Sequence, residues 1–261
     1  PRGTTSSWGT CCGTPGRLFG SIRSGRGWEG AIYSCVRLLG ALGLRMEKES
    51  MAAMSVEEKI RNLAAEYAEQ LEKRIDQRVE EMKDDDRSHF LIYRVLGITD
   101  EEGQLIDVYQ NKGRFLYRYA GAFLESAAKL CFQERYPEAD SVRIPNTQGR
   151  RPRTFEIDCL IDQDAIEIKW RDATTDGDHV TKEHTRIKTV ADAGYTPIRV
   201  MFYYPNRAQA IRIQQTLETL YTGVNGEYYY GENAWDYIKQ RTGIDLKATL
   251  EKIAEENTQR P

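Results

Sequence analysis

Two short alternating segments, separated by three residues, limit the fold of this chain more than any other feature of its sequence. Residues 154–161 (TFEIDCLI) and 165–170 (AIEIKW) both alternate between apolar and polar side chains, which is typical of β-strands. The Asp-Gln-Asp sequence between them favours a tight turn. We therefore expect the two segments to pair as an antiparallel hairpin.

The same alternation sorts the side chains of the hairpin onto two faces. Asp158 should lie on the face opposite the core, where the turn would place it beside Glu167. Lys169 should follow two residues along on that face. The apolar side chains should share the face that packs against the core: Phe155, Ile157, Cys159, Ile161, Ile166 and Ile168.

Segments on both sides of the hairpin complete an α/β pattern. Helices are expected at 55–82, 114–136, 180–193, 205–221, 233–241 and 245–257, and further strands at 89–98, 142–144, 198–204 and 228–230. A hairpin followed by a crossover helix and another strand implies a mixed central sheet with helices on both faces. The remaining helices extend the domain at its N- and C-terminal ends. For the first helix, packing on the body is favoured over a dimer contact.

One acidic residue stands out in the apolar helix expected at 114–136. Glu125 is the only acid between Asp107 and Glu134. A single carboxylate in such a helix costs free energy to bury without a partner. We therefore expect Glu125 to reach towards the acids of the hairpin.

The charge balance restricts how this chain can contact a nucleic acid. A formal net charge of -3 and a pI of about 5.8 exclude a uniformly basic surface, so phosphate contacts would need local patches. The loop 145–153 carries Arg150, Arg151 and Arg153 and no acid. Phosphate contact and a plainly exposed loop both remain open there. Lys182 and Arg186 are further candidates, on one edge of the helix expected at 180–193.

Residues 1–45 differ in composition from the rest of the chain. They contain six Arg, one acidic residue and three of the five Cys, and no hydrophobic period persists. We expect them to be a non-native or disordered leader, the alternative being a flexible arm that touches DNA. Their apolar run, 31–44, is shorter than the roughly 20 residues of a membrane span. Residues 46–261 should form one domain.

The cysteines of that domain argue for a reducing compartment. Only Cys131 and Cys159 remain there, and the chain has no CxxC pair. A structural zinc site and a disulfide framework are therefore not expected. The pattern favours a cytoplasmic protein without a membrane span.

The expected grouping of Asp158, Glu167 and Lys169 suits phosphodiester hydrolysis. Two neighbouring carboxylates repel each other unless a cation lies between them, and their hard oxygens suit Mg²⁺. Such an ion polarises a phosphate and helps to generate hydroxide, while Lys169 would orient the attacking water and offset negative charge. Glu125 would be an outer or second-metal ligand. The simpler alternative is a solvent-facing strand with one ion pair, which contributes little to stability.

This order of residues resembles the PD-(D/E)XK nuclease superfamily. The pattern covers about residues 114–204 as a helix with Glu125, then Asp158, then Glu167-Ile168-Lys169, then a helix and a strand. Ile157 stands where the superfamily often has Pro. The segment 89–257 further resembles ApaLI-like type II restriction endonucleases. The resemblance implies Mg²⁺-dependent double-strand cleavage of a short DNA palindrome by a homodimer, with a cognate DNA methyltransferase in the same system.

Two other functions remain open at this point. The same nuclease core occurs in repair and junction-resolving enzymes, which do not cut at a fixed palindrome. A non-catalytic DNA-binding module with a decayed site is the alternative from a different class. Intact residues at 158, 167 and 169 argue against decay.

Overall fold

The computed structural model describes residues 54–171 and 177–258, and the side chains of 177–179 are not included. The chain divides into two units, Pro1–Ala53 and Met54–Pro261. All described residues belong to the second unit. The predicted leader, residues 1–45, lies outside them.

A five-stranded mixed sheet forms the centre of the described domain. Its strands are β1 (Asp140–Pro145), β2 (Thr154–Ile161), β3 (Asp164–Arg171), β4 (Thr196–Tyr203) and β5 (Glu227–Tyr230), in that spatial order. β2 pairs antiparallel with β1 and β3, whereas β4 pairs parallel with β3 and β5. The prediction of an α/β fold with a mixed central sheet is confirmed.

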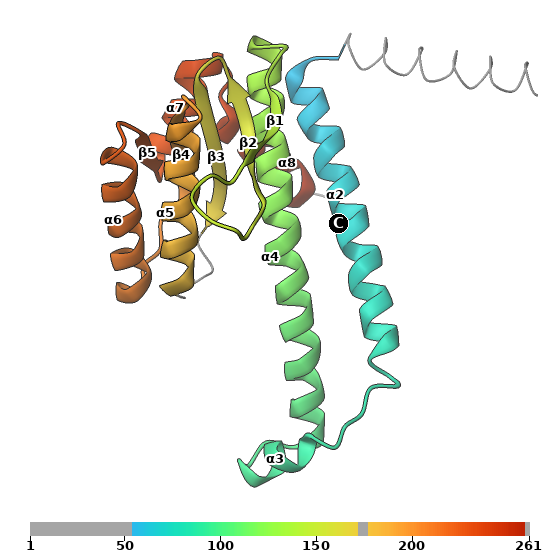
Figure 1. Cartoon of the computed structure of the whole chain (residues 1–261). Helices are drawn as coiled ribbons and strands as arrows, with labels where there is room; N and C mark the ends of the chain where they lie inside the picture. The colour runs from blue at the N-terminus through green and yellow to red at the C-terminus, as the bar shows by residue number, and fades with distance from the viewer. Residues whose placement is uncertain (1–53, 172–176, 259–261) are drawn as a thin grey trace, which may run out of the picture. The chain divides into compact units, whose positions relative to one another are not determined.

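Helices cover both faces of this sheet (Figure 1). Helices α5 (Gly177–Asp192) and α6 (Ala208–Thr222) lie on one face. Helices α4 (Asp100–Arg135) and α7 (Glu232–Thr242) lie on the other, with α2 (Val56–Glu81) and α8 (Leu246–Thr258) packed outside them. The larger apolar core joins the α4 face of the sheet to these four helices, and a smaller cluster lies beneath α5.

Local sequence signals explain where several of these elements begin and end. Ser55 and Glu58 form the capping box predicted for α2, and each accepts a hydrogen bond from the backbone N–H of the other. Gly194 follows α5 with a φ of 87°, a left-handed conformation that glycine adopts readily. β4 is buried at six consecutive positions because helices cover both of its faces.

The strand predicted at 89–98 is wrong. This segment contains the short helix α3 (Phe90–Val95), and α4 begins 14 residues before the predicted start at 114. The sequence signal for that earlier start is a second capping box between Thr99 and Glu102. Gly103 then lies inside the helix, where a Cβ atom would stand 2.6 Å from Cδ2 of Tyr93. The glycine thus lets α3 pack closely on α4.

The predicted common face of β2 is also wrong, because the strand contains a β-bulge. Val142 of β1 pairs with Ile157, but Asp140 pairs with Leu160, so two residues of β2 oppose Ser141 alone. Ile157 consequently packs in the small cluster beneath α5, whereas Cys159 joins the larger core on the α4 face. The two residues in the bulge are Asp158 and Cys159. The hydroxyl of Ser141 donates a hydrogen bond of 3.2 Å to the carbonyl oxygen of Asp158.

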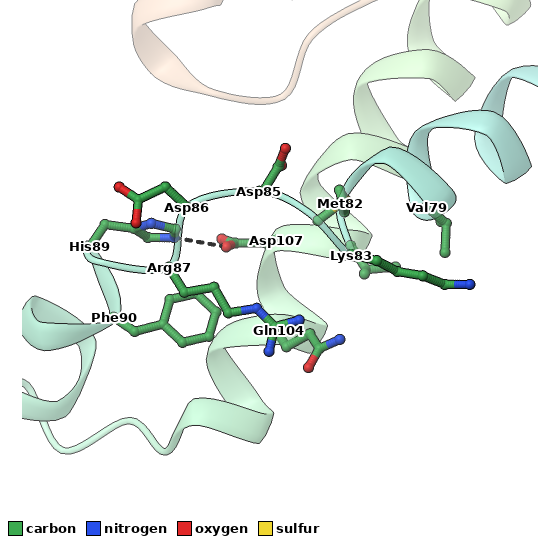
Figure 2. Close-up of a pocket in the computed structure, with 11 residues that line it drawn as sticks. Val79, Met82, Lys83, Asp85, Asp86, Arg87, His89, Phe90, Gln104 and Asp107 are labelled. Atoms are coloured by element: carbon green, nitrogen blue, oxygen red, sulfur yellow. Dashed lines mark hydrogen bonds and ion pairs between the residues drawn. The ribbon is translucent and has the colours of Figure 1, made fainter.

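Beyond the sheet, the second half of α2, the segment that connects it to α3, α3 itself and the first half of α4 form a helical arm (Figure 1). A pocket of about 120 Å³ lies where these helices meet. Figure 2 shows His89 pointing at Asp107 across it, with 3.0 Å between Nε2 and Oδ2. The lining residues all come from the arm, so this pocket belongs to helix packing and not to the hairpin. None of the helices in the described ranges is both long and apolar enough to span a membrane.

Candidate active site

The hairpin brings Asp158, Glu167 and Lys169 together. Nζ of Lys169 lies 2.5 Å from Oε1 of Glu167 and 3.4 Å from Oδ2 of Asp158. It also donates a hydrogen bond of 3.0 Å to the carbonyl oxygen of Ile168. Oδ2 of Asp158 accepts a hydrogen bond of 2.7 Å from the backbone N–H of Ile168. The bulge in β2 and the turn to β3 therefore fix two carboxylates around one ammonium group.

The two carboxylates are largely buried, which excludes the simple solvent-facing ion pair. Glu167 is 3% exposed, and the Asp158 side chain is 12% exposed. Helix α5 supplies part of this cover, because the Arg186 guanidinium contacts Oε1 of Glu167 and lies over the ring of Phe155. A buried carboxylate pair is far more expensive than an exposed one unless cations compensate it.

A second buried ion pair, between Glu183 and Arg199, lies next to Arg186. Oε1 of Glu183 accepts hydrogen bonds from Arg199, at 3.0 Å, and from the Tyr221 hydroxyl, at 2.8 Å. Its Oε2 lies 3.9 Å from Nε of Arg186. Burial opposes ionisation of Glu183, but Arg199 and Arg186 lower its pKa overall. Helix α5 is thus tied to β4 and α6 at the point where it covers Glu167.

Sequence reasoning missed Glu183, Arg199 and Tyr221. One signal was available, because Arg199 is a charged residue within the otherwise apolar strand at 198–204. A charge there must be paired, since β4 is buried on both faces. The identity of its partners depends on the crossover of α5, which the sequence alone does not define.

Burial and neighbouring charges shift the titration of the site. Burial and the Glu167 charge raise the pKa of Asp158 to about 7, although Lys169 acts in the opposite direction. Burial would lower the pKa of Lys169, but Glu167 and Asp158 raise it overall. Burial would likewise lower the pKa of Arg186, and Glu167 and Glu183 raise it. The two cations therefore stay protonated at neutral pH, whereas Asp158 keeps its proton to a much higher pH than an exposed aspartate does.

The donor set of Asp158 and Glu167 fits a hard divalent cation. Oε2 of Glu167 is buried, and no hydrogen-bond partner reaches it within the described part of the chain. Such an orphaned oxygen next to a second carboxylate is the chemistry that Mg²⁺ prefers, since it is bound through one or two carboxylates and keeps several waters. The described residues include no group of three or more His, Cys, Asp or Glu that could hold a metal. Asp158 and Glu167 therefore form a pair of carboxylates and not such a group.

Glu125 lies on α4 and is electrostatically coupled to the site. Burial raises its pKa, and the charges of Lys169 and Glu167 act on it in opposite directions. Its own charge helps to raise the pKa of Asp158. In the described structure it does not complete a three-carboxylate metal site with Asp158 and Glu167. A role as a ligand remains a prediction.

The basic candidates separate into two groups. Arg150, Arg151 and Arg153 are exposed in the loop between β1 and β2, and no ion pair joins them to any described acid. Lys182 is exposed on α5. Arg186, by contrast, points inwards to Glu167. The exposed four remain available for a ligand, whereas Arg186 is part of the buried site.

Comparison with known proteins identifies one family. The family model described as ApaLI-like restriction endonuclease matches residues 46–255, which is well over half of the chain. No curated protein and no solved structure matches this chain.

Proposed function

Because this chain belongs to the family of ApaLI-like restriction endonucleases, we propose that it is a type II enzyme which cuts both strands of duplex DNA at a specific short palindrome. The observation that carries this proposal is the buried Glu167, held between Lys169 and Arg186 and close to Asp158. A buried carboxylate oxygen without a hydrogen-bond partner, beside a second carboxylate, suits a divalent metal ion that assists hydrolysis.

The proposed cofactor is Mg²⁺, held by Asp158 and Glu167. When bound, Mg²⁺ polarises the scissile phosphate and lowers the pKa of a water molecule. The hydrogen bond from Ile168 N–H to Asp158 orients one of the two carboxylates. The orphaned Oε2 of Glu167 supplies a preformed oxygen ligand. Glu125, as a fourth member of the site, acts on it through its charge.

Lys169 is the proposed positioning group for the attacking water. Glu167 and Asp158 keep it protonated, so it donates hydrogen bonds and does not act as the base. A protonated amine at this place would hold a water or hydroxide against the phosphate. It would also offset the negative charge that develops on the phosphoryl oxygens in the transition state.

The proposed DNA contacts are local because the chain as a whole is acidic. Arg150, Arg151, Arg153 and Lys182 would bind phosphates, and their contribution should weaken as salt rises. Arg186 would contact a phosphate only after leaving Glu167. None of these residues is assigned to a base.

The proposed partners follow from the substrate. A palindrome is read by two copies related by a two-fold axis, so we propose a homodimer. A cognate DNA methyltransferase would protect the host sites without binding this protein. The buried thiols of Cys131 and Cys159 are free, and we propose that the enzyme works in the reducing cytoplasm.

Digestion of a plasmid of known sequence tests this proposal. With Mg²⁺ we expect discrete fragments whose sequenced ends share one palindrome, and with EDTA no cleavage. Glu167→Ala should abolish cleavage. Glu156→Gln should cut normally, because Glu156 is an exposed acid of the neighbouring strand β2, paired with Arg143 at 3.0 Å. A smear, or cutting of branched DNA alone, would favour a repair or junction-resolving nuclease, and binding without cleavage would favour a non-catalytic module.

A further inference from the structure

The N-terminal half of α4 keeps exposed the apolar face that its C-terminal half buries. Leu124, Ala127 and Cys131 pack against the sheet from this face. At about 1.5 Å per residue, the 36-residue helix is much longer than the sheet it covers, and its first half extends beyond it (Figure 1). Large side chains on the extended half are 45–66% exposed: Leu105, Ile106, Tyr109, Leu116 and Tyr117.

Helix α3 and the residue that ends it add four more exposed apolar side chains at the tip of the arm. Leu91 and Ile92 are each 57% exposed, Val95 is 72% exposed and Leu96 is 71% exposed. Together with the five residues of α4 they make up what we call the arm face. Nine large apolar side chains that are each 45–72% exposed make a surface of the kind that marks an interaction site. A standard interface buries roughly 800 Å² per partner.

The charge of the arm argues against DNA as the occupant of this face. Residues 91–117, which span the arm face, contain three basic and four acidic residues. This nearly balanced charge gives no net attraction to the phosphate backbone, whose contacts dominate the affinity for DNA. The exposed arginines of the β1–β2 loop lie elsewhere in the fold. The arm face therefore fits a protein surface.

Gly113 indicates how closely a partner surface could approach α4. It lies in the helix between Tyr109 and Tyr117, and a Cβ atom added to it would meet no atom within 4 Å among the described residues. A glycine inside a helix costs roughly 0.5–1 kcal/mol relative to alanine. At Gly103 the ring of Tyr93 accounts for the glycine, but no described contact accounts for Gly113, or for Gly121 eight residues further along α4. A second helix packed against Gly113 would account for that glycine.

The arm face also leads directly to the active site. The rings of Tyr117 and Trp170 are 5.2 Å apart, and Arg171 donates a hydrogen bond of 3.3 Å to the Tyr117 hydroxyl. Trp170 and Arg171 follow Lys169 on β3. A copy of this chain bound to the arm face would therefore approach the end of the strand that carries Glu167 and Lys169.

We propose that the arm face is the surface through which two copies of this chain associate, with their α4 helices antiparallel about a two-fold axis. The choice of a second copy rests on the proposed function, since cleavage of a palindrome needs two sites in a fixed relationship. In this arrangement Leu105 or Tyr109 of one copy fills the space beside Gly113 of the other. The interface is isologous, so each substitution acts twice.

Sedimentation equilibrium of the full chain tests the location of the interface. We expect a dimer at micromolar concentration, and at least about tenfold weaker association for Leu105→Glu and for Tyr109→Glu, because each buries a charge in an apolar contact. Ala68→Glu adds the same charge at an exposed position of α2 and should leave the dimer intact. A monomeric wild type, or glutamate variants that dimerise normally, would overturn the proposal.

The variant Gly113→Leu distinguishes a dimer interface at the arm face from a helix face that is exposed in a monomer. In a monomer the leucine has open space, so it should stabilise the helix and raise the unfolding temperature measured at low protein concentration. In the proposed dimer it collides with the partner helix, so association should weaken at least about tenfold. A more stable protein that dimerises normally would contradict the interface. A wild type that dimerises through the arm but does not cut DNA would leave the interface standing and refute the proposed function alone.

Discussion

Arg199 of β4 donates a hydrogen bond of 3.0 Å to Glu183 of α5, and the two side chains are 1% and 5% exposed. This pair connects α5, the helix that covers the active site, to β4, the strand beside β3 in the sheet. Glu183 also approaches Arg186, and Arg186 contacts Glu167. Arg186 therefore connects the Arg199–Glu183 ion pair to the proposed metal ligand Glu167.

Removing one partner of this pair should destabilise the protein strongly. Arg199→Met leaves Glu183 buried without its main counter-charge, and such a loss costs on the order of 3–5 kcal/mol. Urea unfolding followed by circular dichroism would measure it. The double variant with Glu183→Met should recover much of the loss, whereas Lys239→Met, in the exposed pair with Asp245, should change little. Equal stability of Arg199→Met and wild type would show that the pair contributes nothing.

The metal-free protein should lose stability as pH rises towards neutrality. Asp158 titrates near its ordinary pKa of 3.8 in the unfolded chain, but its pKa in the folded protein is about 7. Between these values the folded state holds a proton that the unfolded state has released. The contribution of Asp158 to the free energy of unfolding is therefore complete below about pH 4 and declines as the pH rises to about 7. The expected loss is on the order of a few kcal/mol.

Unfolding in EDTA at several pH values would measure this slope. Asp158→Asn has no carboxylate to titrate and should flatten the slope while remaining more stable at neutral pH. The same variant should not cut DNA with Mg²⁺. A slope that is unchanged in Asp158→Asn would assign the titration to another group.

Loss of the Lys169 amine should affect the chemical step more than DNA binding. We expect Lys169→Met to reduce the single-turnover cleavage rate by about 10²–10⁴-fold, because it removes the donor that holds the attacking water. Affinity for DNA in Ca²⁺ should change only a few-fold. Arg143→Met removes a base from the exposed side of β1 and serves as the matched control. A parallel loss of affinity and rate would instead make Lys169 a binding residue.

The sequence predicted the hairpin acids because they follow local rules. Alternation along β2 and β3 and the turn between them were sufficient to place Glu167 and Lys169 near Asp158. The faces of β2 were mispredicted because a β-bulge depends on pairing with β1, which no local pattern encodes. The α3 segment was mispredicted because a short apolar run suits either a strand or a helix. Prediction of the Arg186–Glu183–Arg199 network would require the position of the crossover helix α5 on the sheet.

Glu125 should modulate the site through its charge. Its carboxylate helps to raise the pKa of Asp158, so Glu125→Gln should move the acidic limb of the pH–rate profile to lower pH. The rate at neutral pH should fall by less than about tenfold. The loss of a direct ligand would cost far more, on the order of 10²-fold or greater. Cleavage rates between pH 5.5 and 8.5 would distinguish the two roles, and a large loss without a pH shift would make Glu125 a ligand.

Arg186 should compete with a metal for Glu167. Its guanidinium contacts Oε1 of the carboxylate proposed to bind Mg²⁺, so an incoming cation meets a positive charge at the site. Arg186→Met should therefore bind Mn²⁺ several-fold more tightly in the absence of DNA, as measured by calorimetry. Lys188→Met removes a base from an exposed position of the same helix and should not alter metal affinity. In wild type, DNA phosphate would draw Arg186 away from Glu167 and strengthen metal binding. That coupling should disappear in Arg186→Met, and its persistence would mean that the two cations do not share Glu167.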